Sequence, residues 1–399
     1  MQPMRIDTPV AVLGAVLGAV LVACLVVASG SSAQTVPTPD TTTTEDVVAI
    51  AAPRFPIPPE AESAEVTRFS FLVYGDTRGR RDGVNPQYEH SLIVESMLRR
   101  IDILRVGPDP VRFVLQSGDA VVNGRDPRQW NVSFVGLINR LTQEGGVPYF
   151  LAPGNHDVTG SGDVYSPGRE AGLFNYLSAV AELIPADGAT RRLEGYPTYA
   201  FGYGNTFVLA LDSNIAADYA QLAWARAQLE GLDRERYIHV VAFFHHPPFS
   251  SGPHGAPRVE RPTAAVRTHW MPLFRRHRVD LIFTGHEHLF EHWVERYQDE
   301  SGQWRRMDQI VTGGGGAPLY WYRGEPDLRP YLLAGAADSV RVNHLVRPGP
   351  NRGDNPYHYV VVHVDGPDVW MEVVGVDWGI DFQPYRSART TLGESVGRR

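Results

Sequence analysis

Short apolar runs alternate with amphipathic stretches along most of the chain after residue 66. Continuous apolar runs bounded by turn residues are typical of buried strands, whereas apolar residues three and four positions apart are typical of helices. The predicted strands cover residues 69–74, 112–116, 149–152, 198–202, 206–211, 239–244 and 280–284. The predicted helices cover residues 88–104, 129–141, 170–184, 219–232 and 266–277.

The pattern changes after residue 284, where only strands are predicted. They cover residues 290–297, 307–312, 357–364 and 369–376. Alternating strands and helices followed by consecutive strands predict an α/β fold with a late antiparallel portion.

The N-terminal stretch is a predicted export signal. Residues 10–28 are almost wholly apolar and precede small and polar residues, which predicts that residues 1–33 are a secretory signal peptide. The same run could remain as an uncleaved membrane anchor, and residues 21–24 (L-V-A-C) resemble a lipoprotein signal ending at Cys24. All three alternatives predict an extracytoplasmic protein, whether secreted, periplasmic or membrane-anchored.

Three further segments complete the predicted organisation. Residues 34–66 are rich in Thr and Pro and predict an extended linker without a core. Residues 67–385 form the predicted globular domain, and residues 386–399 a flexible tail. The oligomeric state cannot be inferred from this pattern.

The charge argues against a nucleic-acid partner, and the cysteine content excludes an intrachain disulfide and a cysteine-ligated zinc site. The formal net charge is −8 and no run of like charges occurs, which argues against a nucleic-acid partner. Cys24 is the single cysteine, so the chain can form neither an intrachain disulfide nor a cysteine-ligated zinc site.

Polar clusters follow five of the predicted strands. They are Y-G-D-T-R (residues 74–78), S-G-D (117–119), G-N-H-D (154–157), F-H-H-P (244–247) and T-G-H-E-H (284–288). If these strands are parallel neighbours, their carboxyl ends meet at one edge of the sheet. Carboxylate, amide and imidazole groups are ligands for divalent metals, and one central carboxylate could bridge two ions roughly 3.5–4 Å apart.

The ordered set D…GD…GNHD…H-x-P…GHxH resembles the calcineurin-like metallophosphoesterase superfamily, and within it the bacterial purple-acid-phosphatase-like members. The resemblance covers residues 67 to about 376. It implies a four-layer α/β/β/α sandwich of two mixed β-sheets. It also implies hydrolysis of phosphate mono- or diesters by a metal-bound hydroxide, with two divalent ions. Zinc, manganese and iron are all compatible with nitrogen and oxygen ligands.

The resemblance also implies which residues bind metal. Asp119 resembles the bridging carboxylate, and Asp76 and His288 resemble ligands of the first metal. The implied ligands of the second metal are Asn155, His245 and His286. His245 is preferred over its neighbour because the family pattern is His-x-Pro.

Other residues resemble groups that act on the substrate. His156 resembles the phosphate-contacting histidine, sometimes the general acid, and Asp157 would orient it. His254 resembles a substrate-side histidine and is a second candidate proton donor. Arg78 could bind a substrate phosphate through its planar fork, and Asn123 is another possible phosphate contact.

Two positions depart from the family pattern. Most members carry D-x-H at the first motif, where this chain has Arg78, and purple acid phosphatases carry a tyrosine where this chain has Val122. The first metal site is therefore expected to bind weakly, to complete its shell with water or to be empty. Two functions remain open: an active phosphoesterase acting on a small phosphate ester, and a binding or structural protein with a degenerate metal site.

Overall fold

The computed structural model describes residues 45–158, 167–256, 258–334, 339–376, 382–387 and 389–393. The chain divides into two units, residues 1–43 and 44–399, and all described residues belong to the second. The predicted signal peptide or anchor, with Cys24, therefore lies outside the described residues. Among the described helices, none combines the length and apolar character needed to cross a bilayer.

The first sheet has six strands and is mixed. Its order is β13 (Thr390–Leu392), β12 (Asp368–Gly375), β11 (His358–Asp365), β1 (Arg68–Tyr74), β2 (Val111–Gln116) and β3 (Tyr149–Leu151). Strands β1, β2 and β3 are parallel, whereas β11, β12 and β13 join by antiparallel pairing.

The second sheet has seven strands and is also mixed. Its order is β10 (Val340–Val346), β8 (Phe290–Gln298), β9 (Trp304–Thr312), β7 (Leu281–Thr284), β6 (His239–Phe243), β5 (Thr206–Ala210) and β4 (Tyr199–Tyr203). Strands β5, β6, β7 and β9 are parallel, and β4, β8 and β10 pair antiparallel to their neighbours.

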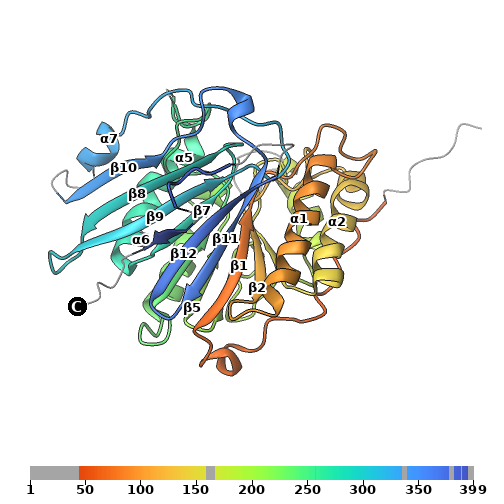
Figure 1. The fold of residues 1–399 in the computed structure, drawn as a ribbon, viewed down its shortest axis with the longest axis horizontal. Coiled ribbons are helices and arrows are strands. Elements are labelled where there is room, and N and C mark those ends of the chain that lie inside the picture. Colours follow the sequence, from red (N-terminus) through yellow and green to blue (C-terminus); the bar gives the residue numbers. More distant parts are fainter. Residues whose placement is uncertain are drawn as a thin grey trace, which may run out of the picture. The chain divides into compact units, whose positions relative to one another are not determined.

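Helices flank both sheets, and Figure 1 shows α1 and α2 beside β1 and β2. The helices are α1 (Tyr88–Arg105), α2 (Gly136–Asn139), α3 (Pro167–Ala179), α4 (Tyr219–Glu230), α5 (Arg261–Ala265), α6 (Met271–His277) and α7 (Arg329–Ala334). Segments η2 (Gln129–Val135) and η3 (Arg140–Gly145) extend α2 at both ends, and η5 (Val266–Trp270) joins α5 to α6. Short 3₁₀ helices are η1 (Glu60–Ser63), η4 (Ser213–Ile215) and η6 (Arg352–Asp354).

In the second sheet, successive side chains of a strand pack into the two cores on opposite faces of the sheet. In β6, Val241 and Phe243 belong to the core that both sheets share with α1, α2 and α3. Val240 and Ala242 belong to a separate core with α4, η5 and α6. Because successive strand residues point to opposite faces, β6 is covered on both sides. The fold is thus the four-layer α/β/β/α sandwich that the resemblance implied.

The structure corrects the predicted linker and tail. Within residues 45–66, the side chain of Ile50 is fully buried, and its N–H donates to Ala179 O at 2.9 Å. In the expected tail, Leu392 is buried and pairs with Val369 across β13 and β12. Both segments contain apolar residues that the body of the domain covers, so each contributes to the core.

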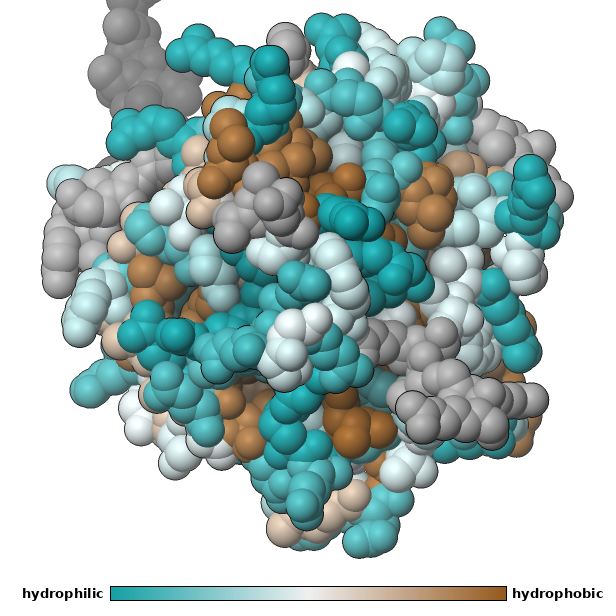
Figure 2. Space-filling view, turned by 90° about the vertical axis from the view of Figure 1, so that its left-hand side faces the viewer, coloured by the Kyte–Doolittle hydropathy of each residue, from teal (hydrophilic) through white to brown (hydrophobic). Residues whose placement is uncertain are grey.

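Some apolar side chains stay exposed on the surface of the molecule, and one face shows how they are spread. On this face, hydrophobic patches are separated by hydrophilic side chains (Figure 2). Scattered exposed apolar groups are ordinary on a globular protein and by themselves do not indicate a partner.

Candidate metal centre

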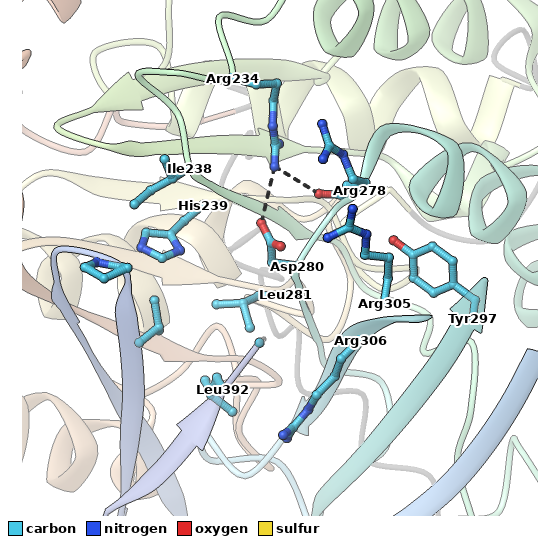
Figure 3. A pocket seen from close by; sticks show the side chains of 13 residues that line it. Arg234, Ile238, His239, Arg278, Asp280, Leu281, Tyr297, Arg305, Arg306 and Leu392 are labelled. Atoms are coloured by element: carbon cyan, nitrogen blue, oxygen red, sulfur yellow. Dashed lines mark hydrogen bonds and ion pairs between the residues drawn. The ribbon is translucent and has the colours of Figure 1, made fainter. Parts of the chain in front are cut away.

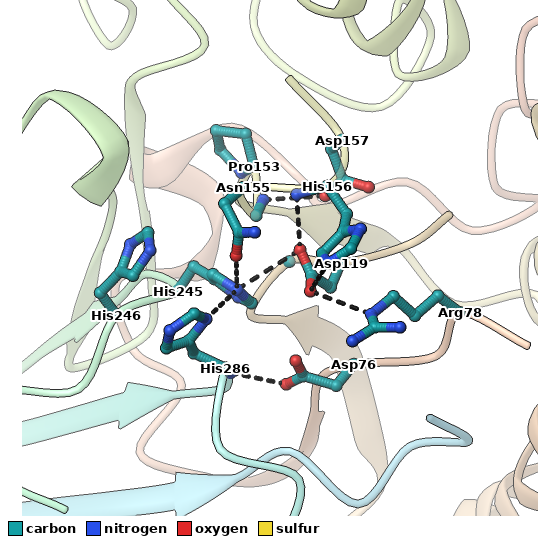
Figure 4. A network of polar contacts seen from close by, with 12 residues as sticks. Asp76, Arg78, Asp119, Pro153, Asn155, His156, Asp157, His245, His246 and His286 are labelled. Atoms are coloured by element: carbon teal, nitrogen blue, oxygen red, sulfur yellow. Dashed lines mark hydrogen bonds and ion pairs between the residues drawn. The ribbon is translucent and has the colours of Figure 1, made fainter. Parts of the chain in front are cut away.

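The five polar clusters follow the carboxyl ends of parallel strands and meet at one edge. Asp76 follows β1, Asp119 follows β2, and Asn155 follows β3. From the second sheet, His245 follows β6, and His286 and His288 follow β7. The N–H of His286 donates to Asp76 Oδ2 at 2.8 Å, which ties the two sheets together at this edge (Figure 4).

Four of these side chains converge on one point. His245 Nε2 lies 2.9 Å from Asn155 Oδ1 and 3.1 Å from His286 Nδ1. It also lies 3.4 Å from Asp119 Oδ1. His245 Nδ1 lies 2.9 Å from the carbonyl oxygen of Ser117, which can only accept, so the proton belongs on Nδ1. The lone pair of His245 Nε2 therefore faces the cluster.

His286 is oriented in the same way. Its Nε2 lies 3.1 Å from a carboxylate oxygen of Glu260, so this nitrogen donates and Nδ1 turns its lone pair toward His245. Burial lowers the pKa of His245 to about 3, which keeps the ring neutral at physiological pH. Neutral imidazole is the form that binds metal.

The lone pairs of these nitrogen and oxygen atoms face one another, which suits the binding of a cation. Two imidazole nitrogens and the oxygens of Asp119 and Asn155 approach one another without a proton between them. Ligand atoms about 2.0–2.2 Å from a tetrahedral zinc-like ion lie roughly 3–3.5 Å apart, close to the separations found here. The residues present therefore fit a divalent ion at this position.

A second cluster joins Asp76, Asp119 and His288, whose ligand atoms lie within 4.8 Å of one another. His288 Nδ1 lies 2.7 Å from Pro318 O, so its Nε2 lone pair faces Asp76 Oδ1 at 3.4 Å. That carboxylate oxygen is buried and has no hydrogen-bond partner in the described part of the chain. Burial lowers the pKa of His288 to about 3, and burial together with Asp119 raises the pKa of Asp76.

Arg78 adds a positive charge beside this second cluster. Its Nε lies 3.3 Å from Asp119 Oδ2, and its Nη2 lies 3.4 Å from His288 Nε2. Burial alone raises the pKa of Asp119, but His245, His156 and Arg78 outweigh it and lower that pKa below its usual range. The guanidinium thus stands where most family members place a ligand histidine, and the cluster offers three ligands instead of four.

The backbone is strained at three of the candidate metal ligands. Asp76, Asp119 and His286 have φ angles of 58°, 56° and 69°. Positive φ is uncommon for residues with a side chain and concentrates at functional sites. Gly118 has φ 101°, and a Cβ there would lie 2.5 Å from Gly154 N. Only glycine lets the loops after β2 and β3 approach this closely.

A cavity of about 280 Å³ opens over both clusters. It is lined by Arg78, Asp119, Asn155, His156, His246, His254, Glu260, Pro262, His286, His288 and Tyr320. This space suits a phosphate group and a small organic substituent, since pockets for drug-sized ligands run from about 300 Å³ upward.

His156 lies at the cavity, but Asp157 does not orient it. His156 Nδ1 lies 2.7 Å from Val122 O, which leaves Nε2 toward the cavity. The carboxylate of Asp157 instead accepts from the N–H groups of Ala120 and Gly154, each at 2.8 Å. The predicted role of Asp157 is therefore corrected: it fixes the backbone that carries the bridging carboxylate.

His254 also lies at the cavity and has acidic neighbours. Its Nδ1 lies 3.4 Å from Glu287 Oε2, and its Nε2 lies 3.9 Å from Glu260. Glu287 Oε1 accepts from the N–H groups of His254 and Gly255 at 2.8 and 2.9 Å. Burial lowers the pKa of His254, but the two glutamates outweigh it and raise that pKa, which suits a proton donor.

The structure separates one predicted residue from the site and adds two. Asn123 does not line the cavity, and its Oδ1 accepts from Arg125 N–H at 3.3 Å. Glu260 and Tyr320 also line the cavity, although neither lies in one of the five strand-end clusters. The Tyr320 ring stacks on His288 with centroids 4.1 Å apart.

Parts of this chain are similar in sequence to known proteins. An uncharacterised protein of Mycobacterium tuberculosis is 28% identical over 270 residues, which are 55% of this chain and 46% of that protein. A probable purple acid phosphatase of Arabidopsis thaliana is 29% identical over 104 residues, which are 26% of this chain and 24% of that protein. The chain therefore spans about half or less of the length of these curated relatives.

A solved structure shares the fold. A purple acid phosphatase isolated from yellow lupin (Lupinus luteus) seeds has a TM-score of 0.57 and 16% sequence identity, over 83% of this chain and 54% of that chain. Residues 69–290, more than half of the chain, match the calcineurin-like phosphoesterase family. This match includes every strand-end cluster from Asp76 to His288, and the chain belongs to the calcineurin-like phosphoesterase family.

Proposed function

We propose that this protein is an extracytoplasmic phosphoesterase that hydrolyses small phosphate mono- or diesters with the help of divalent metal ions. The observation that carries the proposal is the set of electron-pair donors that face one another at the ends of β2, β3, β6 and β7. Such an arrangement is unfavourable without a cation, and it lies at the floor of a cavity of about 280 Å³.

The two clusters would bind metal unequally. Asp119, Asn155, His245 and His286 would hold one divalent ion, and Asp76, Asp119 and His288 a second one more weakly. Bound there, such ions supply Lewis acidity and lower the pKa of water. The weaker cluster lacks a fourth protein ligand and has Arg78 as a cationic neighbour.

Protein side chains would bind the phosphate and move the proton. The planar guanidinium of Arg78 can donate two parallel hydrogen bonds to phosphate oxygens, and His156 Nε2 faces the same space. His254, held by Glu287, would donate its proton to the leaving alkoxide. Tyr320 would contact the organic part of the substrate, because its ring forms one wall of the cavity.

The location outside the cytoplasm rests on the sequence of the N-terminal segment. An apolar run over residues 10–28 is followed by a Thr- and Pro-rich stretch, as expected for an exported protein with a spacer. Cell fractionation with an antibody to the folded domain tests this location. A signal confined to the cytoplasm would contradict it.

Metal content and turnover test the enzymatic proposal together. We expect the purified full chain to bind manganese or zinc and to hydrolyse p-nitrophenyl phosphate or bis-p-nitrophenyl phosphate. Asp119→Ala should lower turnover by about 10³-fold and reduce metal binding, because Asp119 belongs to both clusters. Glu300→Gln, an exposed change with a side chain 84% accessible, is the matched control. Unchanged turnover in Asp119→Ala would refute the mechanism.

A binding protein with a degenerate metal site is the second candidate. The contact between Arg78 and His288 favours it, because a fixed guanidinium could replace an ion without supplying Lewis acidity. In that case the protein would bind inorganic phosphate but would show no turnover of either ester with any added metal.

A further inference from the structure

A second polar pocket lies at the opposite ends of the strands that carry the metal ligands. His239 begins β6 and Leu281 begins β7, and both line this pocket. His245 and His286 follow the other ends of the same strands. Since β6 has five residues, the strand separates the pocket from the metal centre by about 17 Å.

The pocket combines a basic side with an apolar one. Its volume is about 250 Å³. The basic side chains are Arg234, Arg278, Arg305, Arg306 and His239. The apolar side chains include Ile238, Leu281, Val369 and Leu392. Figure 3 shows Arg234 pointing toward Asp280, which lies between His239 and Arg305.

Two of the arginines are held by acidic partners from their own hairpin. Arg305 Nε lies 2.8 Å from Asp299 Oδ2, and Arg306 Nη2 lies 2.6 Å from Asp308 Oδ1. These pairs fix two positive charges at the pocket wall and compensate them.

Arg234 and Arg278 are compensated less well. Arg234 Nη2 lies 3.9 Å from Asp280 Oδ2, and this oxygen already accepts from Val240 N–H at 2.8 Å. Arg234 Nη1 is buried and has no hydrogen-bond partner within the described ranges. Arg234 Nη2 also donates to the backbone oxygen of Arg278 at 3.4 Å, and burial lowers the pKa of Arg234. In the same ranges, no hydrogen bond or ion pair holds the guanidinium of Arg278.

We propose that this pocket binds a small organic anion. Arg234 and Arg278 would hold its phosphate or carboxylate group, and Ile238 and Pro367 would contact its apolar part. The guanidinium of Arg278 is exposed and that of Arg234 has only a distant acidic partner, so both can donate charge-assisted hydrogen bonds to an anionic oxygen. Arginine suits this role because its guanidinium is weakly hydrated and matches the geometry of both anions.

The accessible apolar residues of the pocket argue for an organic ligand over a bare ion. Inorganic phosphate would meet the arginines but would leave Ile238, which is 37% exposed, and the exposed Pro367 in contact with water. An anion with a ring or short alkyl group would cover these two side chains and gain about 25 cal/mol for each Å² of apolar surface removed from water.

Isothermal titration of the full chain tests the proposal with three probes: phenylphosphonate, benzoate and inorganic phosphate. Arg278→Asn removes the exposed charge while keeping the left-handed backbone, because asparagine tolerates the φ of 51°. We expect one binding event to weaken at least tenfold in this variant. Turnover of p-nitrophenyl phosphate should not change. Phenylphosphonate should bind this site more tightly than inorganic phosphate, and comparison with benzoate identifies the preferred acidic group.

Two further variants sharpen the test. Arg276→Asn removes an exposed arginine from the last turn of α6, two residues before Arg278 and outside the pocket, and binding should not change. Arg234→Gln should weaken the same event as Arg278→Asn, with thermal unfolding as the check on its fold. Identical titrations of the wild type and Arg278→Asn with all three probes would overturn the proposal. Turnover is measured separately, so a failed phosphoesterase assay would leave this result interpretable.

Discussion

At the scale of single residues, Arg78 controls how strongly the weaker cluster can bind metal. Arg78→His would replace a fixed cation with a neutral imidazole beside Asp119 and His288, as in the common family motif. We expect the second ion to bind at least about tenfold more tightly, because a ligand is gained and a repulsive charge is lost. Metal titration of the apoprotein measures the two affinities.

A control separates the two causes of this gain. Arg78→Gln removes the charge without adding a ligand nitrogen and should improve binding of the second ion less than Arg78→His does. If neither variant changes the second affinity, the contact of Arg78 with His288 does not limit metal binding.

Glu291 of β8 should make stability depend on pH. This carboxyl is fully buried, and burial raises its pKa to about 7, although hydrogen bonds from Ser251 and Ser250 oppose the shift. A raised folded-state pKa favours the protonated form. The stability that the protonated Glu291 carboxyl contributes to the folded state is thus complete below the unfolded pKa of about 4.5 and is lost as the pH rises through about 7.

Glu291→Gln tests this window because glutamine keeps the shape and remains neutral. We expect the variant to exceed the wild type in free energy of unfolding by up to about 3 kcal/mol at pH 8, and to match it near pH 4.5. Urea unfolding at both pH values measures the difference. Glu300→Gln, at an exposed position, should show no such dependence, and a pH-independent difference for Glu291→Gln would contradict the assignment.

At the scale of elements, the close approach of the loops after β2 and β3 sets the geometry of the metal centre. Gly118→Ala would place a Cβ 2.5 Å from Gly154 N at a φ of 101°, so the loops must separate. We expect a loss of about 2 kcal/mol or more in unfolding free energy and weaker metal binding. Gly136→Ala is the matched control, because nothing lies within 4 Å of its added Cβ in helix α2. That change should stabilise the protein by about 0.5–1 kcal/mol.

Buried strands were the elements that the sequence predicted best. Strands such as β1 and β6 are covered on both faces and therefore read as continuous apolar runs. Strand β10 keeps an apolar/polar alternation over only four residues before Leu345 and Val346 break it, and β13 has three residues, so neither gave a clear signal. Ile50 was placed in a linker because its burial depends on contact with α3, which is distant in sequence.

The candidate metal ligands could be predicted because each follows a strand directly in a short motif. Glu260 reaches the cavity only through the tertiary fold, and nothing in its local sequence indicates it. The aromatic residues 320–322 were open to two interpretations, pocket lining or core packing, and the fold places Tyr320 at the cavity. The role of Asp157 was misjudged for a related reason. Adjacency to His156 suggested a contact between the two side chains, whereas the carboxylate reaches the backbone of Ala120 across two loops.

At the scale of the whole domain, the parallel strands present different chemistry at their two ends. The carboxyl ends gather neutral imidazoles and carboxylates, which suit a cation. The amino ends of β6 and β7 lie beside arginines, which suit an anion. Because the two sites share strands but no side chains, each can be altered without direct loss of the other.

The segment before β1 also belongs to the folded domain, and its removal should be costly. Ile50 is fully buried, and the carboxylate of Glu60 lies 2.8 Å from Arg191 Nε and accepts from Tyr237 Oη at 2.7 Å. A fragment of residues 67–399 should therefore be less stable than one of residues 45–399 by about 3 kcal/mol or more, because the loss of one buried isoleucine alone costs about 2–5 kcal/mol. Urea unfolding of both fragments measures this difference, and Ile50→Ala in the longer fragment should reproduce a large part of it. Equal unfolding midpoints for the two fragments would show that residues 45–66 pack against the domain without stabilising it.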